Sequence, residues 1–310
     1  MQTLPLSPSL VVLAIVIVLA GCATPNSTKV RIETVGDETR VQNALGRTVA
    51  TYHRRPPPGT KLTVDSGDFF HPLATPAGVV VTDLAPGDHP HHRGVFLGWV
   101  EMHGAKDADF WGWGEHAPIQ GRRIVNRSVK PSSDGLRASN EWVADGMVLI
   151  REELEASVRA KATGTVLDLV YRLTPESDVT LSRWAFGGFC LRTRKEGRIE
   201  FASPQGPVSL ANPSHLKPES DWPDAAWYAA TVTLEDGKVF TAAVLNHPRN
   251  PPTLWHNHRD VRMINPCIVA PGEMRLKRGS PLILRYRVVA ADGGVSADLL
   301  NRLAAEWTGK

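Results

Sequence analysis

The chain has 310 residues, of which 42% are hydrophobic and 22% are charged, and its formal net charge at pH 7 is only +3. This balance is typical of a globular protein and excludes an intrinsically disordered chain. Apart from short pairs such as Arg54-Arg55 and Arg122-Arg123, the sequence has no basic block, so it gives no support for nucleic-acid binding.

The first residues are predicted to be an export signal rather than part of the fold. An apolar run over residues 11–20 ends in Leu19-Ala20-Gly21-Cys22, which resembles a bacterial lipobox whose cysteine becomes the lipidated first residue. Because residues 1–10 contain no Lys or Arg, an uncleaved anchor or a weak secretion signal is the alternative. The lipobox predicts a cell-envelope protein held by Cys22 on the periplasmic side, with the outer membrane as the expected location.

The pattern that follows is that of strands. Apolar residues alternate with polar ones over residues 148–158, 166–173 and 282–288, as in strands with one buried face. Turn signals rich in Gly and Pro recur between such runs. Residues 296–307 are instead predicted to be helical, because apolar side chains recur there at helical spacing, namely Leu299, Leu300, Leu303 and Trp307.

These patterns predict an all-β protein, a large antiparallel β-sandwich with a short C-terminal helix. No long linker or internal repeat interrupts the strands. The expected organisation is a signal over residues 1–21, a tether over 22–29 and a single domain over 30–310. Cys190 and Cys267 lie in apolar surroundings, so they form either one disulfide or two buried free thiols.

A dense histidine run lies at residues 88–94, with the sequence Asp88-His89-Pro90-His91-His92-Arg93-Gly94. On an extended strand His89 and His91 would point to one face and His92 to the other. Such imidazoles can share a metal or transfer protons to and from a substrate. Asp88 would orient a histidine, and Arg93 would hold a carboxylate or sugar hydroxyls. A structural hydrogen-bond cluster is the alternative.

A metal site is the weaker interpretation of these histidines. Residues that could supply a third ligand exist, but none stands at a diagnostic spacing; they are His71, Glu115, His116 and His247. We therefore expect acid–base chemistry without a cofactor, while a metal remains open.

A second polar and aromatic run follows at residues 109–116. Trp111 and Trp113 would share a face if extended, and glycines beside them allow a ligand to approach closely. Indole rings stack on the apolar faces of sugars, while Glu115 and His116 can form hydrogen bonds or transfer protons. Packing of both tryptophans in the core is the alternative.

Weaker signals lie farther along the chain. Arg192 follows a predicted strand, and His247 lies at the end of another, so both are expected to contact a ligand. The motif Trp255-His256-Asn257-His258 and the residues Asp221-Trp222-Pro223 lie in loop-rich stretches, where sites and exposed loops are equally expected. The sequence has no Gly-x-Ser-x-Gly motif for nucleophilic catalysis and no phosphate-binding glycine loop.

Several motifs together resemble the PmoA-like family of bacterial exported proteins of unknown function. They are His71-Pro72-Leu73, Thr75-Pro76-Ala77-Gly78, the run at 88–94, Asp109-Phe110-Trp111, Asn246-His247-Pro248, Asn265-Pro266 and residues 279–293. The resemblance covers the chain after the signal, and it implies a sandwich similar to the galactose-mutarotase supersandwich in a carbohydrate-processing context. The label "methane oxygenase" often given to this family does not fit, because the exported chain has no stretch of 18 apolar residues.

The sequence thus predicts an exported lipoprotein that acts on a carbohydrate as a lyase, hydrolase or epimerase. His89 and His91, with His92, would exchange protons, and Glu115 would be a partner acid or base. Ligand contacts are expected from His71, Asp88, Arg93, Trp111, Trp113, His116, Arg192 and His247. The alternative is a lipoprotein that binds a glycan through the same residues without catalysis.

Overall fold

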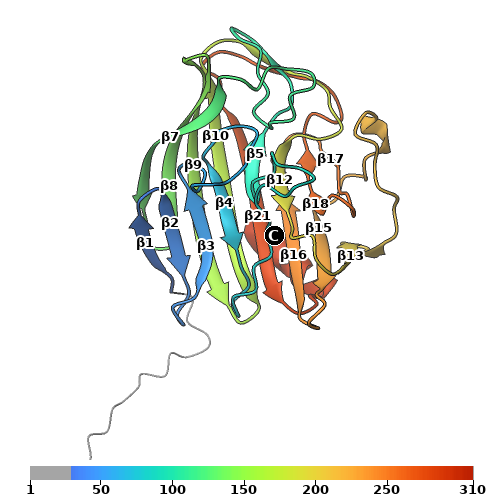
Figure 1. Cartoon of the computed structure of the whole chain (residues 1–310). Coiled ribbons are helices and arrows are strands. Elements are labelled where there is room, and N and C mark those ends of the chain that lie inside the picture. The colour runs from blue at the N-terminus through green and yellow to red at the C-terminus, as the bar shows by residue number, and fades with distance from the viewer. Residues whose placement is uncertain (1–28, 310) are drawn as a thin grey trace, which may run out of the picture.

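The computed structural model describes residues 29–309. The predicted signal, Cys22 and the tether up to residue 28 lie outside the described residues. Two large antiparallel sheets form a sandwich, and Figure 1 shows the first lying over the second. The predicted all-β antiparallel sandwich is confirmed.

The first sheet has seven strands. In spatial order they are β1 (Arg31–Val35), β2 (Glu38–Gln42), β3 (Thr48–His53), β4 (Phe69–Leu73), β5 (Val95–Gly98), β12 (Gly188–Arg192) and β18 (Met263–Ile264).

The second sheet has nine strands. Their order is β14 (Gly206–Val208), β13 (Arg198–Ser203), β15 (Trp227–Thr233), β16 (Val239–Asn246), β21 (Leu282–Asp292), β10 (Gly164–Pro175), β9 (Met147–Lys161), β8 (Gly135–Ala144) and β7 (Arg122–Pro131).

Two small sheets and two helices complete the described part of the chain. One small sheet joins β20 (Met274–Leu276), β11 (Val179–Leu181) and β6 (Met102–His103), and the other pairs β17 (Leu254–Trp255) with β19 (Pro266–Cys267). The helices are the short 3-10 helix η1 (Pro218–Ser220) and the α-helix α1 (Ala297–Thr308). Within residues 29–309, no helix is both long and apolar enough to span a membrane.

The alternating runs fold as predicted because one face of each strand is buried between the sheets. In β10 and β21, Leu169 lies opposite Tyr286 and Tyr171 lies opposite Leu284, and these side chains belong to the main core. The predicted C-terminal helix is confirmed. Ser296 caps α1 by accepting a hydrogen bond from the Leu299 amide.

Apolar side chains also cover the outer faces of both sheets. On the nine-stranded sheet, α1 buries Leu300 against residues of β15, β16 and β21. On the seven-stranded sheet, β5 alternates: Val95 and Leu97 face the main core, and Phe96 belongs to a second cluster on the other face. That second cluster includes Trp111 and Phe186, and it forms the floor of the candidate site. Cys190 and Cys267 are buried free thiols.

Candidate functional site

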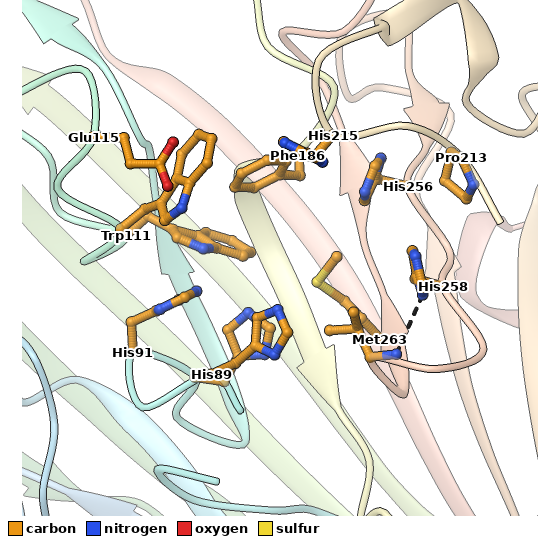
Figure 2. Close-up of a pocket in the computed structure, with 13 residues that line it drawn as sticks. His89, His91, Trp111, Glu115, Phe186, Pro213, His215, His256, His258 and Met263 are labelled. Carbon is orange, nitrogen blue, oxygen red and sulfur yellow. Dashed lines mark hydrogen bonds between the residues drawn. The ribbon is translucent and has the colours of Figure 1, made fainter. Parts of the chain in front are cut away.

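Above this outer cluster lies a cavity of about 330 Å³. Six of the eleven histidines of the chain are among the residues that line it. Figure 2 shows His89, His91 and Trp111 on one side and His256 and His258 on the other. The full lining is His89, His91, His92, Trp111, Trp113, Glu115, Phe186, Pro213, His215, His256, His258, Val261 and Met263.

The histidine run is a turn, not an extended strand. The His89 amide donates to the Pro86 carbonyl at 3.0 Å, and the His92 amide donates to the His89 carbonyl at 3.0 Å. This folding brings three rings together, with centroids 5.0 Å apart for His89 and His92 and 4.6 Å apart for His91 and His92. The expectation that His92 faces away from the other two was therefore wrong, because Pro and Gly residues around the run favour turns.

A buried cation supports the turn from behind. Arg192 is fully buried, and its guanidinium donates to Asp88 at 3.0 Å and to Nδ1 of His92 at 3.3 Å. His92 therefore accepts at Nδ1 and carries its hydrogen on Nε2. Partial burial favours the neutral form of Asp88, but the hydrogen bond from Lys195 and the charge of Arg192 lower its pKa to about 2. Asp88 and Arg192 hold the turn in place and are absent from the cavity lining.

The clustered imidazoles are neutral at pH 7. Burial, followed by the charges of His89 and Arg93, lowers the pKa of His91 to about 3. Burial also lowers the pKa of His92 far below its ordinary value and lowers that of His89. Each neutral ring offers one N–H donor and one nitrogen acceptor, which suits hydroxyl groups and proton abstraction.

The tryptophan run forms a loop that is wound around one carboxylate. Asp109 accepts hydrogen bonds from the amides of Gly112 and Gly114, each at 2.7 Å, and burial raises its pKa to about 6 in spite of these bonds. Gly112 has φ +104°, and a Cβ built there would lie 2.9 Å from the Cβ of His91. The loop therefore packs tightly against the histidine turn. Trp111 is fully buried and Trp113 is half-buried, and both line the cavity.

The opposite wall contains a buried acid–imidazole pair. Nδ1 of His256 lies 2.7 Å from Oδ1 of Asp221, and both side chains are almost completely buried. Burial, followed by the charge of Glu219, raises the pKa of Asp221 to about 8. Burial, followed by the charge of His215, lowers the pKa of His256 to about 3. Between these two pKa values Asp221 is protonated and the ring of His256 is neutral, so the pair carries no net charge.

This pair can act as an acid at neutral pH. Below pH 8 the protonated Asp221 donates to Nδ1, so the hydrogen of His256 resides on Nε2, the nitrogen left for the cavity that His256 lines. Above pH 8 Asp221 is ionised and accepts the hydrogen of Nδ1. Nε2 of His256 then carries no hydrogen and becomes a hydrogen-bond acceptor. Two groups whose environments separate their pKa values in this way, the pair at about 8 and His91 at about 3, fit the roles of acid and base.

The geometry also bears on the metal interpretation. Within residues 29–309, no group of three or more His, Cys, Asp or Glu side chains has an arrangement suited to hold a metal ion. The three rings of the histidine turn pack against one another rather than around a common centre.

A family model matches residues 41–305, which is most of the chain. Its description is a family of unknown function, DUF6807. The chain belongs to this family. No curated protein matches the chain.

Solved structures similar to this DUF6807 chain share little sequence with it. A GH36 α-galactosidase from Geobacillus stearothermophilus, solved with raffinose, is 11% identical at a TM-score of 0.40, covering 86% of this chain and 41% of the α-galactosidase. A galactose mutarotase related enzyme from Lactobacillus acidophilus is 9% identical at a TM-score of 0.32, covering 86% of this chain and 100% of the other. The chain thus spans less than half the length of the α-galactosidase.

Besides Asp88 and Arg192, four more of the residues expected to contact a ligand are absent from the cavity lining of this DUF6807 chain. Arg93 is fully buried behind the site, where it donates to the carbonyl groups of Phe110 and Trp111. His71 hydrogen-bonds with Thr82. His116 packs on Trp113 and Trp184 at the rim, and His247 lines a different cavity beside α1.

Sequence reasoning left the Asp221–His256 pair out of the site. The two residues are separated by 35 positions in the chain, and both lie in loops. The available signal was the polar and aromatic character of both segments, Asp221-Trp222-Pro223 and Trp255-His256, which pair through a bridge between Trp222 and Trp255.

Proposed function

We propose that this protein is a carbohydrate-active enzyme that catalyses proton transfer on a sugar. The observation that carries the proposal is the buried Asp221–His256 pair, which faces a cavity with neutral imidazoles and aromatic rings on its other wall. The cavity volume of about 330 Å³ lies at the lower end of the range of small-molecule sites, which is roughly 300–1,000 Å³.

The composition of the cavity supports a neutral polyhydroxylated ligand. Trp111, Trp113 and Phe186 provide apolar surface, while the imidazoles provide donors and acceptors for hydroxyl groups. None of the described residues that line the cavity is Lys or Arg, so a phosphate or carboxylate on the ligand would have no direct cationic partner. A neutral sugar is therefore favoured over a uronic acid.

The residues that line the cavity also favour some classes of sugar reaction over others. Glycoside hydrolysis ordinarily requires two carboxyl groups that flank the scissile bond. Glu115 is the one carboxylate among the described lining residues, and it is exposed. An acid at His256 and a base at His91 suit ring opening or epimerisation instead, because one proton is delivered while another is removed.

The competing function is a glycan-binding lipoprotein, in which the same groups form hydrogen bonds and stacking contacts. The buried pair favours catalysis, because a binding site has no need of an exchangeable proton. The resemblance to PmoA-like proteins and the lipid anchor at Cys22 remain predictions, and they suit either function.

The test incubates purified protein with free aldoses, glycosides and oxidised sugars, and follows anomeric exchange and deuterium uptake from D₂O by NMR. Asp221→Asn keeps a hydrogen-bonding amide near His256 but cannot exchange the proton, so we expect turnover to fall by about 10²- to 10⁴-fold. His91→Ala should cause a similar loss. His103→Ala, at the exposed position of β6, is the matched control and should leave turnover unchanged.

The two functions predict different outcomes for the same samples. If the protein is an enzyme, the Asp221→Asn variant still binds the sugar but no longer turns it over. If the wild type turns over no sugar but binds one, and His91→Ala abolishes that binding, the enzyme proposal is wrong and the glycan-binding function holds.

A further inference from the structure

Arginine residues from two distant segments of the sequence line one cavity. Arg54 and Arg55 follow β3 of the seven-stranded sheet, and Arg123 lies in β7, at the edge of the nine-stranded sheet. These three side chains and Arg127 line a second cavity, of about 380 Å³, which shares no lining residue with the histidine cavity. Asp65 is the one acidic residue among its described lining residues.

The backbone at this cavity is held by close packing. Gly67 lies so near Arg54 that a Cβ at Gly67 would collide with the Arg54 carbonyl oxygen. The Gly67 amide donates to the Ile124 carbonyl at 3.0 Å, and the Ile124 amide donates to the Ser66 hydroxyl at 2.9 Å. The end of β3 is thus fixed against the start of β7, and the arginines that follow β3 are brought close to those in β7.

One guanidinium is also oriented by a buried polar network. Nε of Arg54 donates to Oδ1 of Asn126 at 2.9 Å, and Asn126 in turn donates to the buried Asn140 at 2.8 Å. This bond leaves the two terminal nitrogens of Arg54 available. Arg127 differs from the others, because its Nε already donates to Glu141 at 2.7 Å.

The remaining cations have no acidic partner. Among residues 29–309, Arg54, Arg55 and Arg123 form no ion pair within 4.0 Å, whereas Arg122 next to them pairs with Asp145 at 2.8 Å. Three unpaired guanidinium groups around one cavity repel one another, and a bound anion would remove that repulsion.

We propose that this cavity binds a tetrahedral oxyanion, as a sulfate or phosphate group that is either free or esterified to a saccharide. Guanidinium groups match such oxygens with paired N–H donors, and convergence from two strands allows several of them to contact one group. The oxyanion site is independent of the function proposed for the histidine cavity, since none of its residues takes part there.

The loop that carries the arginines also touches the histidine cavity. Between Arg55 and Gly67, Thr63 donates its hydroxyl hydrogen to the Gly112 carbonyl at 2.7 Å, and Gly112 packs against His91. The two cavities are therefore joined by one loop, although they share no lining residue.

The test compares two double variants that each remove two exposed cations. Arg55→Ala/Arg123→Ala removes the proposed contacts, and Arg172→Ala/Arg278→Ala is the charge-matched control on other surfaces. Sodium sulfate and sodium phosphate are titrated against the full protein by calorimetry, with sodium chloride at equal ionic strength as the reference. Dextran sulfate and uncharged dextran are titrated in parallel.

We expect the first variant to lose at least about tenfold in affinity for the oxyanion, and the control to stay within about twofold of the wild type. Binding of inorganic sulfate or phosphate identifies the free anion as sufficient, whereas binding of dextran sulfate alone identifies a sulfate ester on a saccharide. Equal losses in both variants would overturn the proposal, and so would a wild type that binds none of sulfate, phosphate and dextran sulfate more tightly than it binds chloride or uncharged dextran. Turnover of sugars plays no part in this readout, so failure here is distinct from failure of the proposed enzyme.

Discussion

At the Asp221–His256 pair, the protein places a carboxyl group and an imidazole 2.7 Å apart where water has little access. Burial makes separate charges costly, so both residues are neutral at pH 7 and Asp221 keeps its proton. The pKa of Asp221, about 8, leaves this residue protonated at neutral pH, when the imidazoles on the opposite wall of the cavity are neutral. The chemistry of the site therefore depends on burial more than on residue type.

The acid role of this pair predicts a pH profile. Because the pKa of Asp221 is raised to about 8, the proton needed for donation is lost as the pH rises through 8, and kcat/KM should fall above that pH. In Asp221→Asn the residual activity should lack this alkaline limb. Rates measured between pH 6 and pH 10 on any sugar that the wild type turns over would check this. A rate that rises through pH 8 would instead make the pair a base.

Buried neutral histidines predict acid sensitivity of the fold. The pKa of His91 is about 3 when folded and about 6.5 when unfolded, so its stabilising contribution is complete above pH 6.5 and is lost as the pH falls toward 3. We expect His91→Gln to lose less free energy of unfolding than the wild type between pH 7 and pH 5, by about 2 kcal/mol. Urea unfolding at both pH values measures this difference.

An exposed histidine provides the opposite control. Hydrogen bonds that the His103 ring donates to Asp107 and Glu101 raise the pKa of His103, so its contribution to stability is present at acid pH and is lost as the pH rises. His103→Gln should therefore make the loss between pH 7 and pH 5 steeper than in the wild type. If both variants behave like the wild type, neither histidine determines the acid sensitivity.

At the scale of elements, strands form the frame and loops supply most of the chemistry. The histidine turn precedes β5, the tryptophan loop lies between β6 and β7, and His256 follows β17. Their mutual placement depends on contacts between loops, such as that of Gly112 with His91 and Thr63.

The contact at Gly112 predicts a large effect from one methyl group. In Gly112→Ala the new Cβ would lie 2.7 Å from the Thr63 hydroxyl and 2.9 Å from the His91 Cβ, at a φ that alanine rarely adopts. We expect a loss of about 1–3 kcal/mol in the free energy of unfolding and weaker sugar binding. Gly87→Ala, where the Cβ meets no atom within 4 Å, should change neither quantity. If Gly112→Ala and Gly87→Ala change the free energy of unfolding and sugar binding equally, the loop around Gly112 accommodates the methyl group and the prediction is wrong.

At the scale of the whole molecule, the sandwich keeps three features of its surface apart. The histidine cavity lies on the outer face of the seven-stranded sheet, α1 covers the outer face of the nine-stranded sheet, and the arginine cavity joins β3 to β7. The predicted anchor at Cys22 would tether the molecule before β1.

The predicted lipid anchor implies that replacing the sulfur atom of Cys22 changes where the protein is found in the cell. Cys22→Ser removes the thiol that would carry the lipid, so the protein should move from the membrane fraction to the soluble fraction of the envelope. Cell fractionation and intact mass of the wild type check this. Unchanged membrane retention, together with a wild-type mass that shows no lipid, would contradict the lipobox interpretation.

Sequence patterns predicted the frame and part of the site. Period-two alternation located β9, β10 and β21 because a half-buried strand imposes it on neighbouring residues. The composition of the two polar runs located His89, His91, His92, Trp111, Trp113 and Glu115, which do line one cavity. The same reasoning could not tell Arg93 from these residues, since a buried guanidinium that supports a loop has the same sequence signal as one that binds a ligand.

By itself, the sequence determined which segments are strands and which stretches are rich in reactive side chains, because both properties are local. Only the tertiary structure decided that Asp221 meets His256 opposite the histidine turn, and that Arg55 meets Arg123. Loops have no periodic pattern, and their conformations follow from distant packing. Burial, which sets the protonation of each histidine, is likewise a property of the folded whole.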